Sequence, residues 1–347
     1  MAKSRLFKND IDMLATNELL EIPLNKLEIA LESSFVGRLI EKVKKELKRK
    51  LPHLTPYFWV SNEWFCPDGT QGVAIPFYLL NSRLIRLEEE MIGYAEGKDS
   101  DWCLKLIRHE LGHVVDNAYN LRRCRERSQI FGKSSLPYRC RYTFKEFSKG
   151  YVQHLEDGYA QAHPVEDFAE TFAVWLDPKS KWRTKYKGWP VYSKLLWIDK
   201  KMKELADQQP LCFDEAGEVD NISDLSETLR SHYKNRRRYL GTDKAKFWDK
   251  YLTKTFAVAA NIQGDYHYSA DKFIRKYRKE LTRDLAEMQG KYLYQIDRII
   301  NEVEKRARVL NLKVGKRGEI DIKKNMRYHL NKGVGQYILE GKNQIPF

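Results

Sequence analysis

The 347-residue chain lacks several features that would place it in other classes of protein. Its five cysteines are scattered and include no C-x-x-C pair, which argues against a disulfide framework and favours a reducing compartment. No apolar run approaches the ~18 residues that span a bilayer, and residues 1–20 lack the continuous apolar core of a secretory signal. Internal repeats and low-complexity tracts are also absent. These absences predict a cytoplasmic, globular protein without a membrane partner.

Acidic residues are too few to balance the basic ones, and the formal net charge is +14. Residues 221–347 hold 28 Lys and Arg against 15 Asp and Glu, whereas residues 1–220 hold 34 against 33. Such asymmetry raises the question of a polyanionic partner such as nucleic acid. However, the charges of both signs are interspersed, and no recognised nucleic-acid motif accompanies the run Arg236–Arg238. A solvated helical surface is therefore the favoured interpretation, and oligomeric state stays open.

The hydrophobic pattern predicts a helix-rich protein with a few strands. Helical spacing of apolar residues is found in five segments, which are 35–51, 101–120, 164–176, 192–205 and, as one long helix, 269–310. Two β-type runs, Tyr57–Val60 and Gly72–Leu79, lie between the first two helices. Because Pro76 cannot donate a hydrogen bond to a neighbouring strand, the second run is expected to lie at a sheet edge or to contain a bulge. The fold class is therefore α+β, with a small mixed sheet.

Composition also predicts where the chain divides. The stretch 207–228 is acidic and poor in large apolar residues, so it is expected to be a linker or an exposed loop. Residues 1–206 would form the first domain, and residues 229–347 a basic, mainly helical C-terminal region. The glycines expected to interrupt the end of that region are Gly315, Gly318, Gly333 and Gly335.

The chemistry is concentrated in the motif His109-Glu110-Leu111-Gly112-His113, an H-E-x-x-H sequence on a predicted helix. Residues at i and i+4 lie on one helical face, so both imidazoles can reach one metal ion. Glu110 lies beside them and can hold a water molecule. A catalytic zinc usually takes three protein ligands, which predicts a third ligand downstream.

The best source of that ligand is the segment from His163 to Ala173. Glu166 and Glu170 are four residues apart on one helical face, where two carboxylates repel unless a cation or a hydrogen-bond donor neutralises them. One can bind zinc while the other accepts an N–H from a ligating histidine. An acidic helix N-terminus is the alternative, although it explains Glu170 less well. His163, at the expected cap position, and His154 are less favoured ligands.

These residues carry a family resemblance. Over about residues 20–205, the chain resembles a bacterial family of zinc-binding metallopeptidases, through the segments FWVSNEWFCPDG, GVAIPFYL, RHELGHVVDNAY, HPVEDFAETFAVWL and KWRTKYKGWP. The H-E-x-x-H motif with a later glutamate resembles gluzincin-type enzymes. The spacing of Tyr159, Glu166 and Glu170 is similar to that in the catalytic domain of the lethal-factor toxin, where a tyrosine precedes the glutamate ligand and an outer glutamate follows it.

The resemblance implies a zincin-like fold and a zinc-dependent peptidase with a peptide or protein substrate. It implies one catalytic zinc bound by His109, His113 and Glu166, with Glu110 as general base. Tyr159 would stabilise the oxyanion or protonate the leaving amine, with Tyr151 as its rival, and the residues supporting the ligands would be Glu170 and Asp116. From zincins generally, the run Gly72–Leu79 is expected to offer an unpaired edge to the substrate. The alternative function is a zinc-containing protein that binds a polyanion through its basic C-terminal region, without hydrolysis.

Overall fold

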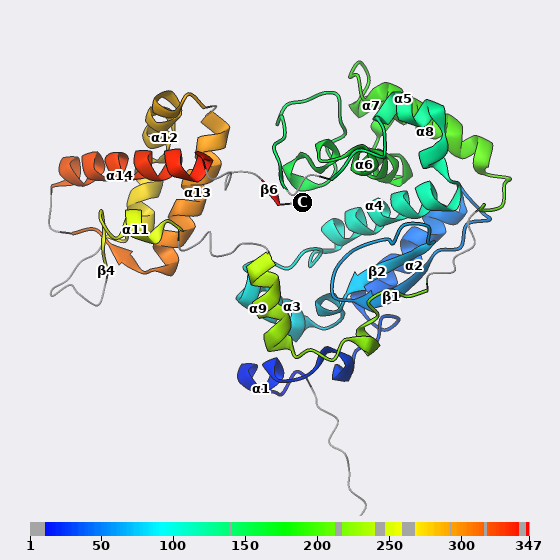
Figure 1. The fold of residues 1–347 in the computed structure, drawn as a ribbon, viewed down its shortest axis with the longest axis horizontal. Helices are drawn as coiled ribbons and strands as arrows, with labels where there is room; N and C mark the ends of the chain where they lie inside the picture. The colour runs from blue at the N-terminus through cyan, green and yellow to red at the C-terminus, as the bar shows by residue number, and fades with distance from the viewer. Residues whose placement is uncertain are drawn as a thin grey trace, which may run out of the picture. The chain divides into compact units, whose positions relative to one another are not determined.

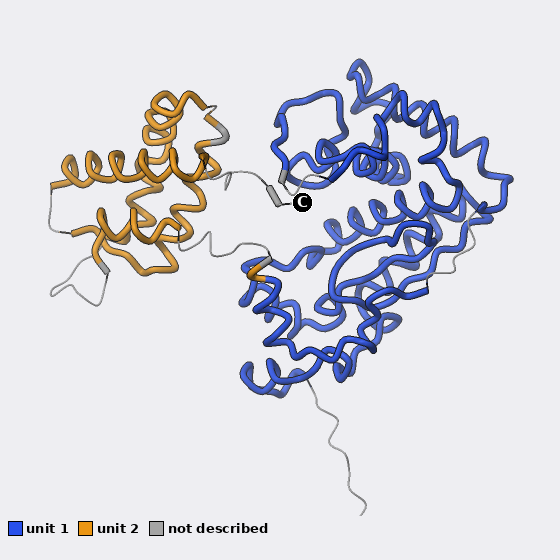
Figure 2. The backbone as a smooth tube through the Cα atoms, viewed as in Figure 1, with its two compact units in different colours: residues 1–236, 347 blue, residues 237–346 orange. Residues whose placement is uncertain are grey.

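A computed structural model describes most of the chain. The residues described are 11–138, 141–211, 217–239, 247–258, 268–291, 293–315, 318–339 and 345–346. Cys140 and Cys212 lie outside these ranges, and the other three cysteines are free thiols. The chain forms two compact units, residues 1–236 and residues 237–346 (Figure 2).

Unit 1 combines helices with one short sheet (Figure 1). Its α-helices are α1 (Thr16–Leu20), α2 (Phe35–Lys48), α3 (Ser82–Ile92), α4 (Ser100–Ala118), α5 (Arg125–Phe131), α6 (Pro164–Leu176), α7 (Trp182–Lys185), α8 (Tyr192–Leu205) and α9 (Leu229–Tyr239), which runs across the boundary between the units. Its strands are β1 (Tyr57–Ser61), β2 (Gly72–Pro76) and β3 (Arg141–Tyr142). Its 3-10 turns are Leu24–Lys26, Phe77–Leu80, Leu121–Arg123, Glu156–Gln161 and Ile222–Asp224.

The small sheet pairs β1 with β2 in parallel, with Tyr57 opposite Gly72 and Ser61 opposite Pro76. Every residue of β2 is buried. The chain between the two strands returns along the other edge of β2, where the amide of Ala74 donates to the carbonyl of Phe65 at 2.8 Å. The prediction of an unpaired edge is therefore wrong at Ala74, because a neighbouring segment already occupies that edge.

Helix α4 is the centre of unit 1 and contacts α6, α2 and β2. A bidentate ion pair from Arg108 to Glu46, with N–O distances of 2.9 and 3.1 Å, ties it to α2. The crossing with α6 is close, since a Cβ built on Gly112 would lie only 2.7 Å from the Cα of Ala169. A glycine at this position lets the two helix backbones approach each other.

The predicted linker forms part of unit 1 where the structure describes it. Trp59 donates its indole N–H to the carbonyl of Val219 at 2.9 Å, and the hydroxyl of Ser61 donates to the carbonyl of Asp220 at 2.8 Å. Val219 and Asp220 therefore lie against β1, and further along the stretch the carbonyls of Leu225 and Glu227 accept from the amides of Asn25 and Leu24 at 3.0 and 2.9 Å. The observed division falls after Arg236, within α9, and the predicted limits at residues 206 and 229 stay a prediction.

Unit 2 is mainly helical around its own apolar core. Its elements are α11 (Asp249–Leu252), β4 (Ala257–Val258), α12 (Ala270–Gln289), α13 (Leu293–Val309), β5 (Leu312–Lys313), α14 (Glu319–Leu339) and β6 (Ile345–Pro346). The predicted single helix over residues 269–310 is wrong, because α12 ends at Gly290, which has a φ of 58°. Gly333 and Gly335 lie inside α14 instead of ending it. Gly333 faces Trp248, and a Cβ there would approach the indole to 2.8 Å.

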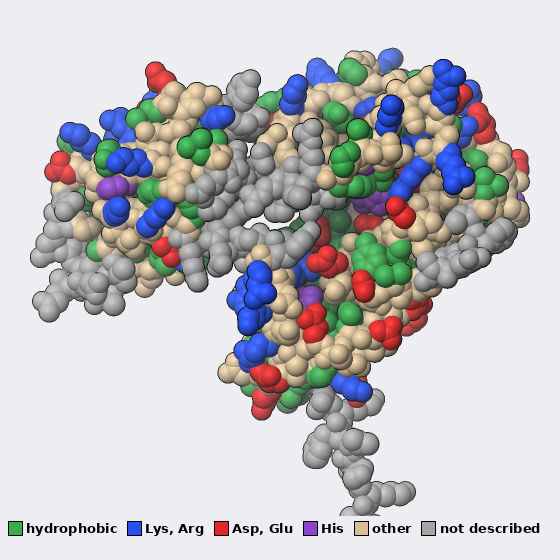
Figure 3. All heavy atoms as spheres, in the orientation of Figure 1, with side chains coloured by type: hydrophobic (Ala, Val, Ile, Leu, Met, Phe, Trp, Pro, Cys, Tyr) green, Lys and Arg blue, Asp and Glu red, His purple; other side chains and the backbone are tan. Residues whose placement is uncertain are grey.

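Many basic side chains of unit 2 are paired with acidic ones. Arg306 binds Asp249 through two N–O contacts of 2.7 and 2.8 Å, and Arg278 contacts Asp297 at 2.6 Å. On the face shown in Figure 3, blue Lys and Arg side chains are spread among other types. A nucleic-acid partner stays a prediction. Among the helices that the structure describes, none combines the length and apolar character needed to cross a bilayer.

Candidate metal centre

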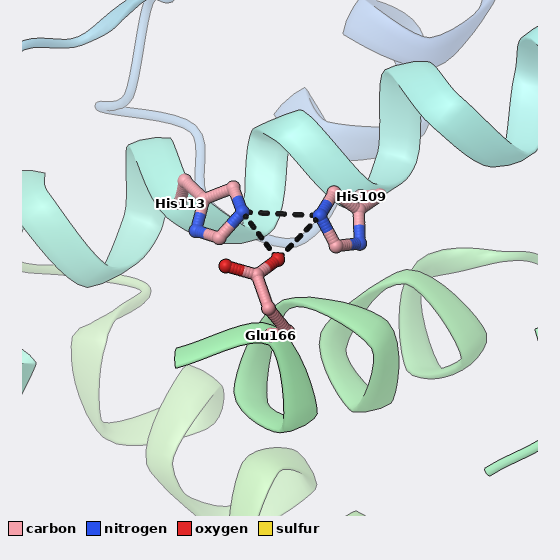
Figure 4. A group of neighbouring side chains, drawn as sticks. All are labelled: His109, His113 and Glu166. Carbon is pink, nitrogen blue, oxygen red and sulfur yellow. Dashed lines mark hydrogen bonds and ion pairs between the residues drawn. The ribbon is translucent and has the colours of Figure 1, made fainter. Parts of the chain in front are cut away.

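Helices α4 and α6 bring together two imidazoles and one carboxylate (Figure 4). His109 and His113 come from adjacent turns of α4, and their Nε2 atoms lie 3.0 Å apart. Oε2 of Glu166, from the first turn of α6, lies 3.1 Å from the first of these nitrogens and 3.3 Å from the second. All three candidate ligand atoms lie within 4.8 Å of one another, so they could hold one metal ion.

The surroundings of His109 decide which ring nitrogen faces this cluster with a lone pair. Its Nδ1 lies 2.8 Å from Oε1 of Glu170. Since an ionised carboxylate can only accept, Nδ1 carries a proton, and with a metal bound the ring would hold its only proton there and present the Nε2 lone pair to the cluster. This is the tautomer that a metal-binding histidine requires.

The carboxylate of Glu166 tests whether the cluster suits a cation. Its Oε2 atom is buried and has no hydrogen-bond partner among the residues that the structure describes, although two imidazole nitrogens lie within 3.3 Å. A buried carboxylate oxygen without a donor is costly unless a positive charge is present. Burial alone would lower the pKa of His109, but the neighbouring carboxylates of Glu166 and Glu170 outweigh it and raise that pKa well above its usual value, so positive charge is favoured at this point. The donor set therefore fits a divalent ion.

Glu110 lies beside the cluster on α4, with only 6% of its surface exposed. Burial raises the pKa of this carboxyl, and the positive charges of His109 and His113 partly offset the increase. A carboxylate whose pKa is raised binds a proton more readily than an exposed one. Such a group suits the role of a general base.

Glu170 makes the contacts expected of a residue that orients a ligand. It is only 1% exposed, and it holds His109 through one oxygen while the other accepts from the amide of Leu155 at 2.9 Å. Burial would raise the pKa of Glu170, but the nearby His154 and the hydrogen bond from His109 lower it below its usual value. The carboxylate consequently stays ionised and fixes the imidazole.

Asp116, which was expected to support a ligand histidine, contacts two arginines instead. It is fully buried, and its Oδ2 atom lies 2.9 Å from Arg127 and 3.1 Å from Arg122. These arginines connect the end of α4 to the segment after it. A supporting role of Asp116 toward a histidine stays a prediction, and its observed partners are arginines.

The two candidate tyrosines lie in different surroundings. The ring of Tyr159 lies 5.5 Å from that of His109 between centroids, whereas the ring of Tyr151 lies under the ammonium of Lys194 at 4.3 Å. Burial, followed by the charges of Glu166 and Glu110, raises the pKa of Tyr159 well above its usual value. Its phenol is therefore a proton donor at any ordinary pH.

The two histidines that were less favoured as metal ligands, His163 and His154, make other contacts. His163 caps α6, since its Nδ1 accepts from the amide of Val165 at 3.2 Å and its Nε2 lies 2.8 Å from the carbonyl of Leu136. His154 contacts the carbonyl of Lys105 at 3.0 Å through its Nε2. Neither lies in the metal cluster.

Sequence reasoning missed Tyr138. Its hydroxyl donates to Oε1 of Glu166 at 3.1 Å, and its ring stacks on that of His163 with centroids 3.8 Å apart. The hydrogen bond holds the carboxylate so that the other oxygen faces the histidines. Tyr138 lies in an irregular segment 28 residues before Glu166, so no periodicity or motif could have indicated it.

Comparison with known proteins gives one match. Residues 103–189 match the model of a protein family described as "Putative zinc-binding metallo-peptidase". The matched segment contains all three residues of the metal cluster as well as Glu110. No curated protein and no solved structure matches the chain.

Proposed function

We propose that this protein is a zinc-dependent peptidase that hydrolyses a peptide bond or a related amide bond. The convergence of His109, His113 and Glu166, with the orphaned Glu166 oxygen among them, carries the proposal. This set of two histidines and one glutamate is a known catalytic zinc combination. The family match over residues 103–189 supports the choice of zinc and of peptide hydrolysis.

A zinc ion held by these residues would supply a Lewis acid that polarises a carbonyl and increases the acidity of water. Glu110 then removes a proton from the attacking water and later delivers it to the departing amine. Its burial favours the first transfer, because the raised pKa makes the carboxylate a better proton acceptor. Glu170 maintains the orientation of His109 throughout.

Tyr159 is the candidate for stabilising negative charge on the carbonyl oxygen. Its ring lies against that of His109, and its phenol stays protonated because burial and nearby carboxylates raise its pKa. A protonated hydroxyl beside the reacting carbonyl can donate a hydrogen bond that strengthens as the oxygen gains charge. The ring position favours Tyr159 over Tyr151 for this role.

We also propose a gluzincin-type arrangement and a cytoplasmic setting. The gluzincin-type arrangement is supported by the placement of the histidine pair and the glutamate on two helices that cross beside a small sheet. The cytoplasmic setting is supported by the free thiols of Cys66, Cys103 and Cys124, which suit a reducing compartment.

The test combines metal analysis with a peptide-library cleavage profile of the full chain and the Glu110→Gln variant. We expect zinc to remain bound in the variant while hydrolysis falls by about 10²–10⁴-fold, since that is the usual contribution of a general base. Glu90→Gln, which removes an exposed carboxylate of α3, is the matched control and should cleave as the parent does. A zinc-loaded parent chain that cleaves no peptide would overturn the proposal. Full activity in Glu110→Gln would remove Glu110 as the base.

A further inference from the structure

Glu96 lies in the turn between α3 and α4. The next residue, Gly97, packs on this helix, since a Cβ built on it would lie 3.1 Å from Cδ1 of Leu106. Leu106 precedes Glu110 by four residues, so the two side chains share one face of α4. Glu96 is therefore placed beside the face that carries Glu110, about one helical turn away from it.

The carboxylate of Glu96 is not used by the fold. Its backbone carbonyl accepts from the hydroxyl of Tyr78 at 3.3 Å, which holds the turn, but its side chain makes no ion pair or hydrogen bond within the described ranges. The residue is half-buried, and neither carboxylate oxygen is sealed from solvent. Arg236, whose charge acts on this carboxyl, contacts Glu63 at 3.2 Å and Glu88 at 3.4 Å.

Electrostatics connect this carboxylate to the site. Burial raises the pKa of Glu96, Arg236 lowers it, and the charges of Glu110 and His109 raise and lower it respectively. The placement itself comes from packing: because Gly97 contacts Leu106, a cation next to Glu96 would lie about one helical turn from Glu110.

An aromatic ring completes the surroundings. The Cβ position of Gly97 is 3.4 Å from Cζ2 of Trp64, which places the indole beside the Glu96 turn. The indole Nε1 is buried and has no hydrogen-bond partner among the described residues. Cζ2, an edge carbon of the six-membered ring, therefore faces this turn. An apolar ring edge can cover the aliphatic stem of a lysine or arginine whose cationic end reaches a carboxylate.

We propose that Glu96 and Trp64 receive a lysine or arginine side chain of the substrate, next to the bond that is cut. This inference rests on the proposed function for the identity of the ligand as a peptide. The free carboxylate would pair with the cationic end, and the indole would pack against its stem. The protein would thus prefer peptides that carry a basic residue beside the scissile bond.

The experiment uses the zinc-loaded full chain and pairs of peptides that differ only by lysine or norleucine at each position flanking the bond cleaved in a library. We expect the lysine peptide to show a kcat/KM about 10–100-fold higher, as a charged hydrogen bond contributes. In Glu96→Gln this ratio should fall to about one, and in Glu96→Arg a glutamate peptide should be preferred. The control Glu90→Gln should retain the parent ratio.

A second readout separates this inference from the proposed function. Binding of the same peptide pairs to the Glu110→Gln chain is measured by fluorescence anisotropy, which needs no hydrolysis. A lysine preference that disappears in the double variant Glu110→Gln/Glu96→Gln supports the inference even if the parent chain cleaves nothing. The inference about Glu96 is overturned if both assays show no difference between lysine and norleucine peptides, or if the lysine preference survives Glu96→Gln. Neither result bears on whether the protein is a peptidase.

Discussion

Replacing Gly112 by alanine tests whether the helix crossing sets the geometry of the metal centre. Gly112 lies between the two histidines of α4, and it faces Ala169, three residues after Glu166 on α6. The new Cβ would lie 2.7 Å from the Cα of Ala169, 3.0 Å from its carbonyl oxygen and 3.1 Å from its Cβ. Since two carbons pack best at about 3.5–4.0 Å, the helices would have to separate by roughly 1 Å.

This displacement can be compared with what the site tolerates. Metal–ligand distances vary by only about 0.2 Å in well-formed sites, so a shift of about 1 Å between Glu166 and the histidines should weaken zinc binding by at least about tenfold. Overpacking costs about 1–3 kcal/mol, and the better helix propensity of alanine returns up to about 1 kcal/mol. The net loss of unfolding free energy should be about 0–2 kcal/mol.

Urea denaturation of the metal-free protein and chelator competition for zinc measure the two effects separately. The matched control is Gly335→Ala in α14, where the nearest atoms belong to the flexible end of Gln289 at 3.3 Å. That variant should be unchanged or more stable by up to about 1 kcal/mol, with unaltered zinc affinity. If Gly112→Ala binds zinc within twofold of the parent and is equally stable, the close crossing does not control the site.

Two further predictions concern the ligand set and acid stability. Glu166→Ala should lose most of its bound zinc in metal analysis. Glu170→Gln should retain zinc at about 10–100-fold lower affinity, because only the support of His109 is lost. Equal zinc content in the two variants would contradict the assignment of Glu166 as a ligand and Glu170 as its support. Burial, with the charge of Arg236, lowers the pKa of His232 from 6.5 to about 4, so the unfolded chain binds a proton that the folded chain does not between these values. Stability should therefore fall as pH drops through this window, by about 2 kcal/mol from pH 7 to pH 5. In urea titrations His232→Phe should reduce that loss, and an identical loss in both proteins would exclude His232 as its source.

Local sequence patterns predicted the elements that carry the site. The apolar period over residues 101–120 and the proline at position 164 match α4 (Ser100–Ala118) and α6 (Pro164–Leu176) closely. This works because helix period and helix caps depend on residues within a few positions of each other. The same locality places both histidines of the motif on one face. Patterns failed where packing decides, since Gly290 ends a helix while Gly333 continues one against Trp248.

The sequence by itself determined the chemistry that the chain can offer: a histidine pair, an adjacent glutamate and a second acidic helix. Tertiary structure alone decided which partners these groups meet. It selected Glu166 for the cluster and Glu170 for the outer nitrogen of His109, and it brought the unexpected Tyr138 onto Glu166. The fold also paired Asp116 with Arg122 and Arg127. The physical reason is that i, i+4 spacing fixes a face within one helix, whereas the crossing of two helices and the path of a loop depend on contacts between residues far apart in the chain.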